Sequence, residues 1–147
     1  METLRVLVID DEPGMRMAVA RALRSYRVTL PEIEGDASFI VEQAETGEIG
    51  LEKIRDLDPD ILLVDYKLPG MSGLDVLESI AGEEREMMSV MMTAYASIET
   101  AVTATKRGAF DFLAKPFTPE ELKAVIRKAS EQLILRRRAR MLAEEKR

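Results

Sequence analysis

Short apolar segments rich in β-branched residues alternate with amphipathic segments five times along the chain. The apolar segments are almost continuously hydrophobic, as expected of strands covered on both faces. The amphipathic segments repeat their apolar residues at helical spacing. This alternation predicts an α/β fold in which helices cover both faces of a parallel sheet. We expect strands at 5–9, 39–44, 61–64, 88–92 and 110–114, and helices at 13–26, 47–57, 72–80, 97–108 and from 118 onward.

Several of the predicted helices begin with recognisable capping residues. Ser72 and Ser97 stand immediately before amphipathic segments, where a side-chain oxygen can accept a hydrogen bond from a free backbone N–H group. Thr118 is followed by Pro119 at the first helical position and by Glu121 three residues after the cap, which predicts a capping box.

The composition limits the available chemistry. The chain has 147 residues, of which 46% are hydrophobic and 33% charged, which is typical of one folded domain. It contains no histidine and no cysteine, which excludes Ser-His-Asp and Cys-His catalysis, ordinary zinc sites and disulfides. A bound metal is therefore expected to be a hard cation held by oxygen ligands.

The same composition limits location and partners. The net charge of -6 argues against nucleic-acid binding by the domain. No apolar run approaches the roughly 18 residues of a membrane span, and the N-terminus lacks the pattern of a signal peptide. We expect a cytoplasmic protein that does not enter the membrane.

Polar residues follow the predicted strands at the points where the strands end. Asp10 and Asp11 follow the first strand, Asp65 the third, Thr93 the fourth and Lys115 the fifth. The carboxyl ends of parallel strands meet at one edge of a sheet, where ligands bind in such folds. Taken singly, each residue is more simply a turn, cap or solvated charge, and their convergence is what favours a site.

These residue types suit phosphoryl transfer. Clustered carboxylates repel one another unless a cation lies among them, and Mg²⁺ binds carboxylates, water and phosphate oxygens. Lys115 and Thr93 can hold the oxygens of a transferring phosphoryl group. Asp65 can act as the nucleophile and form an aspartyl phosphate.

Four segments, VLVIDDEP, ILLVDYKLPGMSG, VMMTAYAS and AFDFLAKPF, resemble the signature segments of response-regulator receiver domains of two-component signalling, the CheY-like superfamily. The resemblance covers about residues 4–130, in family order and spacing. It implies a doubly wound, flavodoxin-like sheet of five parallel strands in the order 2-1-3-4-5.

The resemblance also implies the ligands of the site. Asp10 and Asp11 bind Mg²⁺ together with Asp65 and the backbone carbonyl of Lys67. Asp65 accepts the phosphoryl group, and Lys115 pairs with the resulting phosphate. The Lys115–Pro116 peptide bond is expected to be cis.

Further residues are implied to act in switching. Thr93 bonds a phosphoryl oxygen and moves on activation, and Phe112 stands at the position of the switch aromatic residue. Lys67 and Tyr95 are expected to lie over the phosphoryl group. Neither can orient an attacking water as a carboxylate or amide does, so we expect slow hydrolysis of the aspartyl phosphate.

The implied function is a phospho-accepting receiver in two-component or phosphorelay signalling. A histidine kinase or phosphotransfer protein donates the phosphoryl group, and phosphorylation shifts the face formed by the fourth helix, fifth strand and fifth helix. The domain catalyses its own Mg²⁺-dependent phosphorylation and turns over no separate substrate. A second copy of the chain is a further expected partner, through that face or the C-terminal helix.

Two segments depart from the family pattern. Residues 27–38 are inserted before the second strand, and we interpret them as a tolerated surface insertion, with a hairpin pairing 28–30 with 39–41 as the alternative. Residues 131–147 continue the last helix without glycine or proline, which predicts a signalling helix beyond a receiver of residues 1–130. Such a helix leads either to a transcriptional output or to a histidine kinase within a larger regulator.

Three other functions stay open at this point. A Mg²⁺-dependent phosphohydrolase also uses an aspartate nucleophile, but it needs a second carboxylate where this chain has Lys67. A docking module that acts without phosphorylation would not need the acidic site. The third alternative is a stand-alone phosphorelay shuttle.

Overall fold

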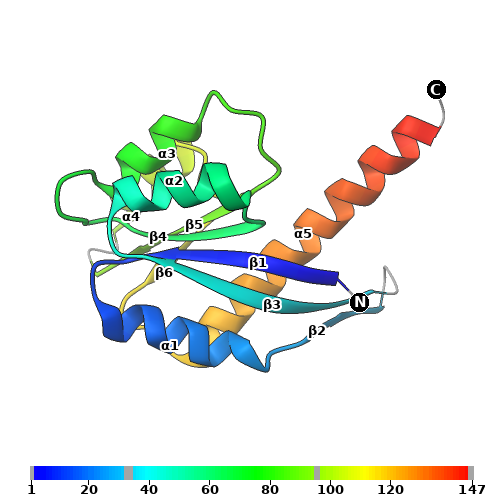
Figure 1. Cartoon of the computed structure of the whole chain (residues 1–147), viewed down its shortest axis with the longest axis horizontal. Coiled ribbons are helices and arrows are strands. Elements are labelled where there is room, and N and C mark those ends of the chain that lie inside the picture. The colour runs from blue at the N-terminus through cyan, green and yellow to red at the C-terminus, as the bar shows by residue number, and fades with distance from the viewer. Residues whose placement is uncertain (1, 32–34, 95–96, 146–147) are drawn as a thin grey trace.

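The computed structural model describes residues 2–31, 35–94 and 97–145. In this part of the chain, six strands form one sheet in the order β2-β3-β1-β4-β5-β6 (Figure 1). The strands are β1 (Glu2–Ile9), β2 (Val28–Leu30), β3 (Gly35–Ala44), β4 (Ile61–Asp65), β5 (Met88–Thr93) and β6 (Asp111–Ala114).

The four strand pairings that join the five predicted strands are all parallel, as expected. Strand β1 pairs in parallel with β3 and β4, β4 with β5, and β5 with β6. The predicted doubly wound sheet is therefore confirmed, with one antiparallel strand, β2, added at the edge beside β3. The prediction of five strands in total is corrected to six.

Helices cover both faces of the sheet. The elements are α1 (Pro13–Arg24), α2 (Gly47–Leu57), α3 (Gly73–Ile80), α4 (Ile98–Lys106) and α5 (Pro119–Glu145). Helices α1 and α5 contribute to one apolar cluster, and α2, α3 and α4 contribute to the other. Figure 1 shows α1 on the opposite side of the sheet from α2 and α3.

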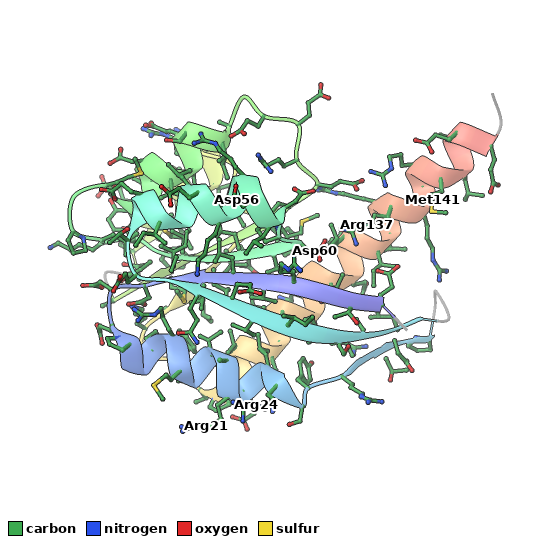
Figure 2. All side chains as sticks on the ribbon, viewed as in Figure 1. Arg21, Arg24, Asp56, Asp60, Arg137 and Met141 are labelled. Atoms are coloured by element: carbon green, nitrogen blue, oxygen red, sulfur yellow. The ribbon has the colours of Figure 1, made fainter. Side chains whose placement is uncertain are left out.

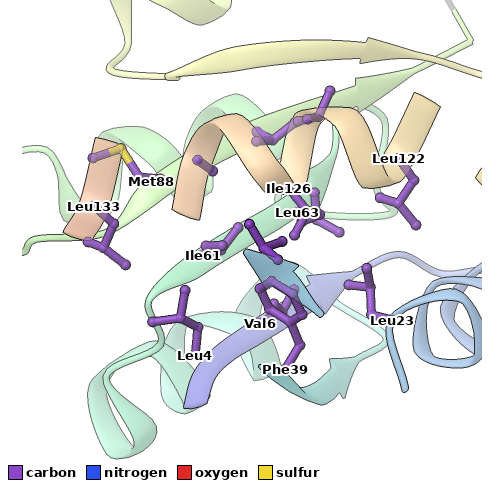
Figure 3. Close-up of a cluster of buried hydrophobic side chains, with 14 of the residues drawn as sticks. Leu4, Val6, Leu23, Phe39, Ile61, Leu63, Met88, Leu122, Ile126 and Leu133 are labelled. Carbon is purple, nitrogen blue, oxygen red and sulfur yellow. The ribbon is translucent and has the colours of Figure 1, made fainter. Parts of the chain in front are cut away.

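The strands are apolar throughout because their two faces lie in different cores. In β1, Leu4 and Val6 point into the cluster with α1 and α5, whereas Leu7 and Ile9 point into the other. Figure 3 shows the first cluster, where residues of α5 lie over β1, β3 and β4. The methionines of β5, Met88, Met91 and Met92, are buried in these cores.

The predicted helix caps are present. The Ser72 hydroxyl accepts from the Asp75 N–H at 3.2 Å, and the Ser97 hydroxyl accepts from the Thr100 N–H at 3.1 Å. The Thr118 hydroxyl accepts from the Glu121 N–H at 3.1 Å, and the Glu121 carboxylate accepts from the Thr118 N–H at 3.1 Å. This reciprocal pair fixes where α5 begins.

The segment inserted before the second predicted strand is more than a surface loop. Its two ends form the antiparallel hairpin β2–β3, in which Val28 pairs with Ala37 and Leu30 with Gly35. Both Val28 and Leu30 are fully buried. The hairpin that was the alternative to a surface loop therefore forms, but in a different register, with β3 beginning at Gly35 rather than at residue 39.

Helix α5 runs without interruption through the boundary that the sequence suggested after residue 130. Leu133 and Ile134 lie beyond that point and are buried in the core. The division into a receiver and a C-terminal signalling helix stays a prediction. Among the described residues, we find no helix with the length and apolar character needed to cross a membrane.

Candidate functional site

Four neighbouring strands deliver polar side chains to the same edge of the sheet. Asp10 directly follows β1, Asp65 ends β4, Thr93 ends β5 and Lys115 directly follows β6. The strands are in level register, since Ile9 pairs with Val64 in the parallel sheet. The backbone N–H of Lys115 donates to the Thr93 carbonyl at 2.8 Å, which extends the β5–β6 ladder to the edge.

The Lys115 ammonium lies between two of the carboxylates. Its Nζ is 2.7 Å from Asp10 Oδ2 and 3.2 Å from Asp65 Oδ2. The Asp10 side chain is fully buried, and the side chains of Lys115 and Asp65 are only 11% and 10% exposed. Water therefore screens these charges weakly, and the two ion pairs are strong local interactions.

This environment perturbs both groups. Burial raises the pKa of Asp65, and the neighbouring Asp10 charge adds to the rise, although Lys115 and the Lys67 backbone hydrogen bond oppose it. For Lys115, burial acts to lower the pKa, but the Asp10 hydrogen bond and the charges of Asp10 and Asp65 outweigh it and raise the pKa. A perturbed carboxylate beside a fixed cation in a cavity is typical of functional sites.

The carboxylates of Asp10, Asp11 and Asp65 could together hold a metal ion. One oxygen from each lies within 4.8 Å of the others, and Asp11 is exposed to solvent. An adjoining cavity of about 230 Å³ is lined by Asp11, Glu12, Asp65, Lys67, Ala94 and Lys115. Carboxylate oxygens beside such a cavity fit Mg²⁺, which usually keeps several of its waters and binds one or two carboxylates.

Two contacts that the sequence did not reveal hold Asp10 in place. The second oxygen of its side chain, Oδ1, accepts from the Glu12 N–H at 2.9 Å. The Arg16 guanidinium donates to the Asp10 carbonyl at 2.7 Å, one helical turn into α1. An arginine on an amphipathic helix gives no sequence signal of such a contact.

Gly73 has a close contact at the other side of the site. A Cβ atom placed on this glycine would lie 2.2 Å from the Asp65 carbonyl oxygen. The Gly73 N–H donates to the Tyr66 carbonyl at 3.1 Å, so the start of α3 packs directly on the backbone that follows Asp65. Only glycine allows this approach. The repeated glycine in LPGMSG was the available sequence signal.

The remaining predicted residues lie as follows. Thr93 is buried, and Phe112 is partly buried against the cluster with α2, α3 and α4. Lys67 is exposed and lines the cavity beside Asp65. Tyr95 lies outside the described residues. The Lys115–Pro116 peptide bond is cis, as expected.

Comparison with known proteins agrees with this geometry. The family profile described as "Response regulator receiver domain" matches residues 6–127. The regulatory protein AtoC of Escherichia coli K12 is 32% identical over 138 residues, which cover 94% of this chain and 28% of AtoC. The DNA-binding transcriptional regulator NtrC of the same organism is 34% identical over 124 residues, 84% of this chain and 24% of NtrC.

A solved structure is similar over nearly its whole length. The CheY-like response regulator receiver domain protein of Methanospirillum hungatei superposes with a TM-score of 0.72 at 32% identity, over 89% of this chain and 97% of that one. By contrast, the chain spans only about a quarter of the length of the curated relatives AtoC and NtrC.

Proposed function

The chain belongs to the response regulator receiver domain family, and we propose that Asp65 is the residue that accepts its phosphoryl group. The observation that carries this proposal is the position of Asp65, at the end of a buried strand, 3.2 Å from Lys115 and within 4.8 Å of two further carboxylates. A phosphorylated partner histidine is the proposed donor.

The proposed transfer has a simple balance. An oxygen of the Asp65 carboxylate attacks phosphorus, the phosphorus–nitrogen bond of the phosphohistidine breaks, and its electron pair returns to the imidazole. An acyl phosphate forms on Asp65. Catalysis of such a step is mainly positioning and charge neutralisation.

Residues of this chain supply the positioning. Lys115 is held by Asp10, so its ammonium stays beside Asp65 and can bind an oxygen of the incoming phosphoryl group. The Thr93 hydroxyl is the proposed partner of a second phosphoryl oxygen. Asp10, Asp11, Asp65 and the Lys67 carbonyl would hold Mg²⁺, which neutralises charge on the phosphoryl oxygens when it is bound.

Switching is proposed to follow from the added negative charge. The phosphoryl group draws Thr93 and Lys115 towards it, and Phe112, which is packed against the cluster with α2, α3 and α4, repacks. The surface of α4, β6 and α5 then shifts its population between two arrangements. Similarity to AtoC and NtrC favours a transcriptional output in a larger regulator over a histidine kinase.

The test is the intact mass of the protein after incubation with a small phosphoryl donor and Mg²⁺. One added phosphate is expected in the wild type and in Asp56→Asn, an exposed aspartate on α2 (labelled in Figure 2), but none in Asp65→Asn. A phosphate on folded Asp65→Asn protein would contradict the assignment. No phosphate on the wild type would favour a docking module or a strict need for its own kinase.

Slow hydrolysis is the second part of the proposal. Lys67 lines the cavity beside Asp65, and a lysine there cannot act as base or orient a water. Lys67→Asn should shorten the lifetime of the phosphorylated form several-fold, whereas Lys128→Asn on α5 should not. An unchanged lifetime in Lys67→Asn would count against this role. Continuous release of phosphate from a generic ester by the wild type would instead revive the phosphohydrolase alternative.

A further inference from the structure

The part of α5 beyond residue 130 contributes to the same apolar cluster as strand β2 of the inserted hairpin. Leu133 and Ile134 are 0% and 3% exposed, and they share one apolar cluster with Val28, Leu30 and Leu4. Strand β2 contacts α5 directly. Figure 3 shows Leu133 beside Met88, with Leu4 and Ile61 below.

The apolar side chains of β2 lie on one face of the strand. The side chains of Val28 and Leu30 are buried, while Thr29 between them is exposed, so β2 presents one apolar face inward. Pairing with β3 extends that face past the first residues of β1. Strand β2 therefore adds two buried apolar side chains to the cluster in which the apolar face of α5 is buried.

One turn further along α5, the contact becomes ionic. Arg137 pairs with Asp60 and lies 3.7 Å from Glu2 and 3.8 Å from Glu86, while Arg140 pairs with Glu86 at 2.6 Å. Figure 2 shows Asp60 and Arg137 close together where α5 passes the amino end of β4. The Asp60 side chain is only 16% exposed and that of Arg137 28%.

Asp60 is itself held rigidly. Its backbone N–H donates to the Arg5 carbonyl at 2.8 Å, and its carbonyl accepts from the Met88 N–H at 3.0 Å. Its second carboxylate oxygen accepts from the Arg5 N–H at 2.7 Å. Asp60 is therefore hydrogen-bonded to both β1 and β5 at the amino end of β4. The carboxylate that pairs with Arg137 is thus held by the sheet, so a shift of α5 would break the ion pair.

We propose that the hairpin β2–β3 and Asp60 form an intramolecular docking surface for residues 131–140 of α5. The surface fits a helix that carries two adjacent apolar residues followed by an arginine one turn later. Docking holds the extension to the domain and fixes the direction in which exposed Leu135, Met141 and Leu142 are presented. On this account, strand β2 within the inserted segment supports the long helix.

Docking has a consequence for signalling, which rests on the proposed function. Strand β4 carries Asp60 directly before its first residue and Asp65 as its last. Ion pairs connect both ends of β4 to α5 or to the residues just before it. Lys115, shortly before α5, pairs with Asp65, and Arg137 within α5 pairs with Asp60. A displacement of Lys115 towards a phosphoryl group thus acts on a helix that is anchored at its far end.

The test is hydrogen exchange of the full chain, read by mass spectrometry without phosphorylation. In Arg137→Gln, amides of residues 131–140 should exchange roughly tenfold faster. Loss of a charged hydrogen bond of this kind raises the equilibrium constant for local opening by about that factor. Amides of 119–130 should be unchanged. Arg136→Gln, which removes the same charge from an exposed neighbour, should leave exchange unchanged, and Arg137→Lys should recover part of the protection.

Equal exchange of residues 131–140 in Arg137→Gln and wild type would overturn the proposal. So would equal acceleration in Arg136→Gln, which would indicate a general charge effect. If Arg137→Gln fails to fold, the wild type is compared at low and at about 1 M salt, where ionic contacts are screened within about 3 Å. Protection that does not fall selectively in 131–140 would then overturn it. Whether these variants gain a phosphate on Asp65 is measured in a separate experiment, so failure of the docking proposal can be distinguished from failure of the proposed function.

Discussion

Lys115 Nζ lies 2.7 Å from Asp10 Oδ2, so the ammonium neutralises a carboxylate that is completely buried. The same ammonium is farther from Asp65, at 3.2 Å. Lys115 is therefore the internal counter-ion of the residue proposed to bind Mg²⁺, as well as the neighbour of the proposed phospho-acceptor. A divalent cation bound by Asp10 must therefore share the Asp10 carboxylate with the Lys115 ammonium.

Lys115→Met should strengthen Mg²⁺ binding while it abolishes efficient phosphorylation. Removing a positive charge that opposes the cation should tighten binding by on the order of tenfold. The apo variant should lose about 3–5 kcal/mol of stability, because Asp10 stays buried without its partner. Thermal unfolding at increasing MgCl₂ measures the affinity, since a ligand stabilises only the folded state that binds it.

Lys128→Met, on the exposed face of α5, is the matched control. Weaker or unchanged Mg²⁺ binding in Lys115→Met would show that the two cations do not compete.

Asp65→Asn should be more stable than wild type at pH 7 in the absence of divalent cations. Burial raises the pKa of Asp65, so the folded state binds its proton more tightly than the unfolded chain does. The stability contributed by Asp65 is therefore fully present below its ordinary pKa of 3.8 and is lost as the pH rises through the higher folded value. Asparagine resembles the protonated form at every pH.

The measurement is urea unfolding of both proteins at a series of pH values. The stability advantage of Asp65→Asn should be greatest near neutrality and should shrink as the pH falls. Asp56→Asn, an exposed change of the same kind, should show no such advantage. A gap that stays constant or widens on acidification would mean that burial does not govern the ionisation of Asp65.

The residues proposed to do chemistry were predictable from sequence because their position follows from topology. A parallel sheet must bring the ends of β1, β4, β5 and β6 together, and Asp10, Asp65, Thr93 and Lys115 stand at those ends. Their types then indicate a cation and a phosphoryl group. No three-dimensional distance was needed for that step.

The features that were missed depend on contacts between distant residues. Arg137 and Asp60 are 77 residues apart, and a single charge on each leaves no periodic signal. The register of the hairpin was wrong because β2 has only three residues, too few for their pattern to select among registers. Leu133 is buried among residues far from it in the sequence, such as Leu4 and Met88 (Figure 3), so its burial could not be predicted either.

Gly73→Ala should impair the site although it adds only a methyl group. The new Cβ would lie 2.2 Å from the Asp65 carbonyl oxygen, which is backbone and cannot rotate away. Overpacking of this kind costs about 1–3 kcal/mol and should displace Asp65 from Lys115. The rate of phosphorylation by a small donor and the urea midpoint should both fall. Gly14→Ala is the control, because no atom lies within 4 Å of its added Cβ. Normal phosphorylation in Gly73→Ala would show that the backbone after Asp65 can yield.

Leu133→Ala and Leu135→Ala provide a matched pair two residues apart on α5. Leu133 is completely buried in the apolar cluster that also holds Val28 and Leu30 of β2, whereas Leu135 is 40% exposed. Leu133→Ala should lower the free energy of unfolding by about 2–5 kcal/mol, because it opens a cavity in the core. Leu135→Ala should lower it by less than about 1 kcal/mol, since surface substitutions have small effects. Urea unfolding at 25 °C distinguishes these values. Similar small losses in both variants would mean that α5 does not pack beyond residue 130 in solution, and the inserted hairpin would then have no helix to support.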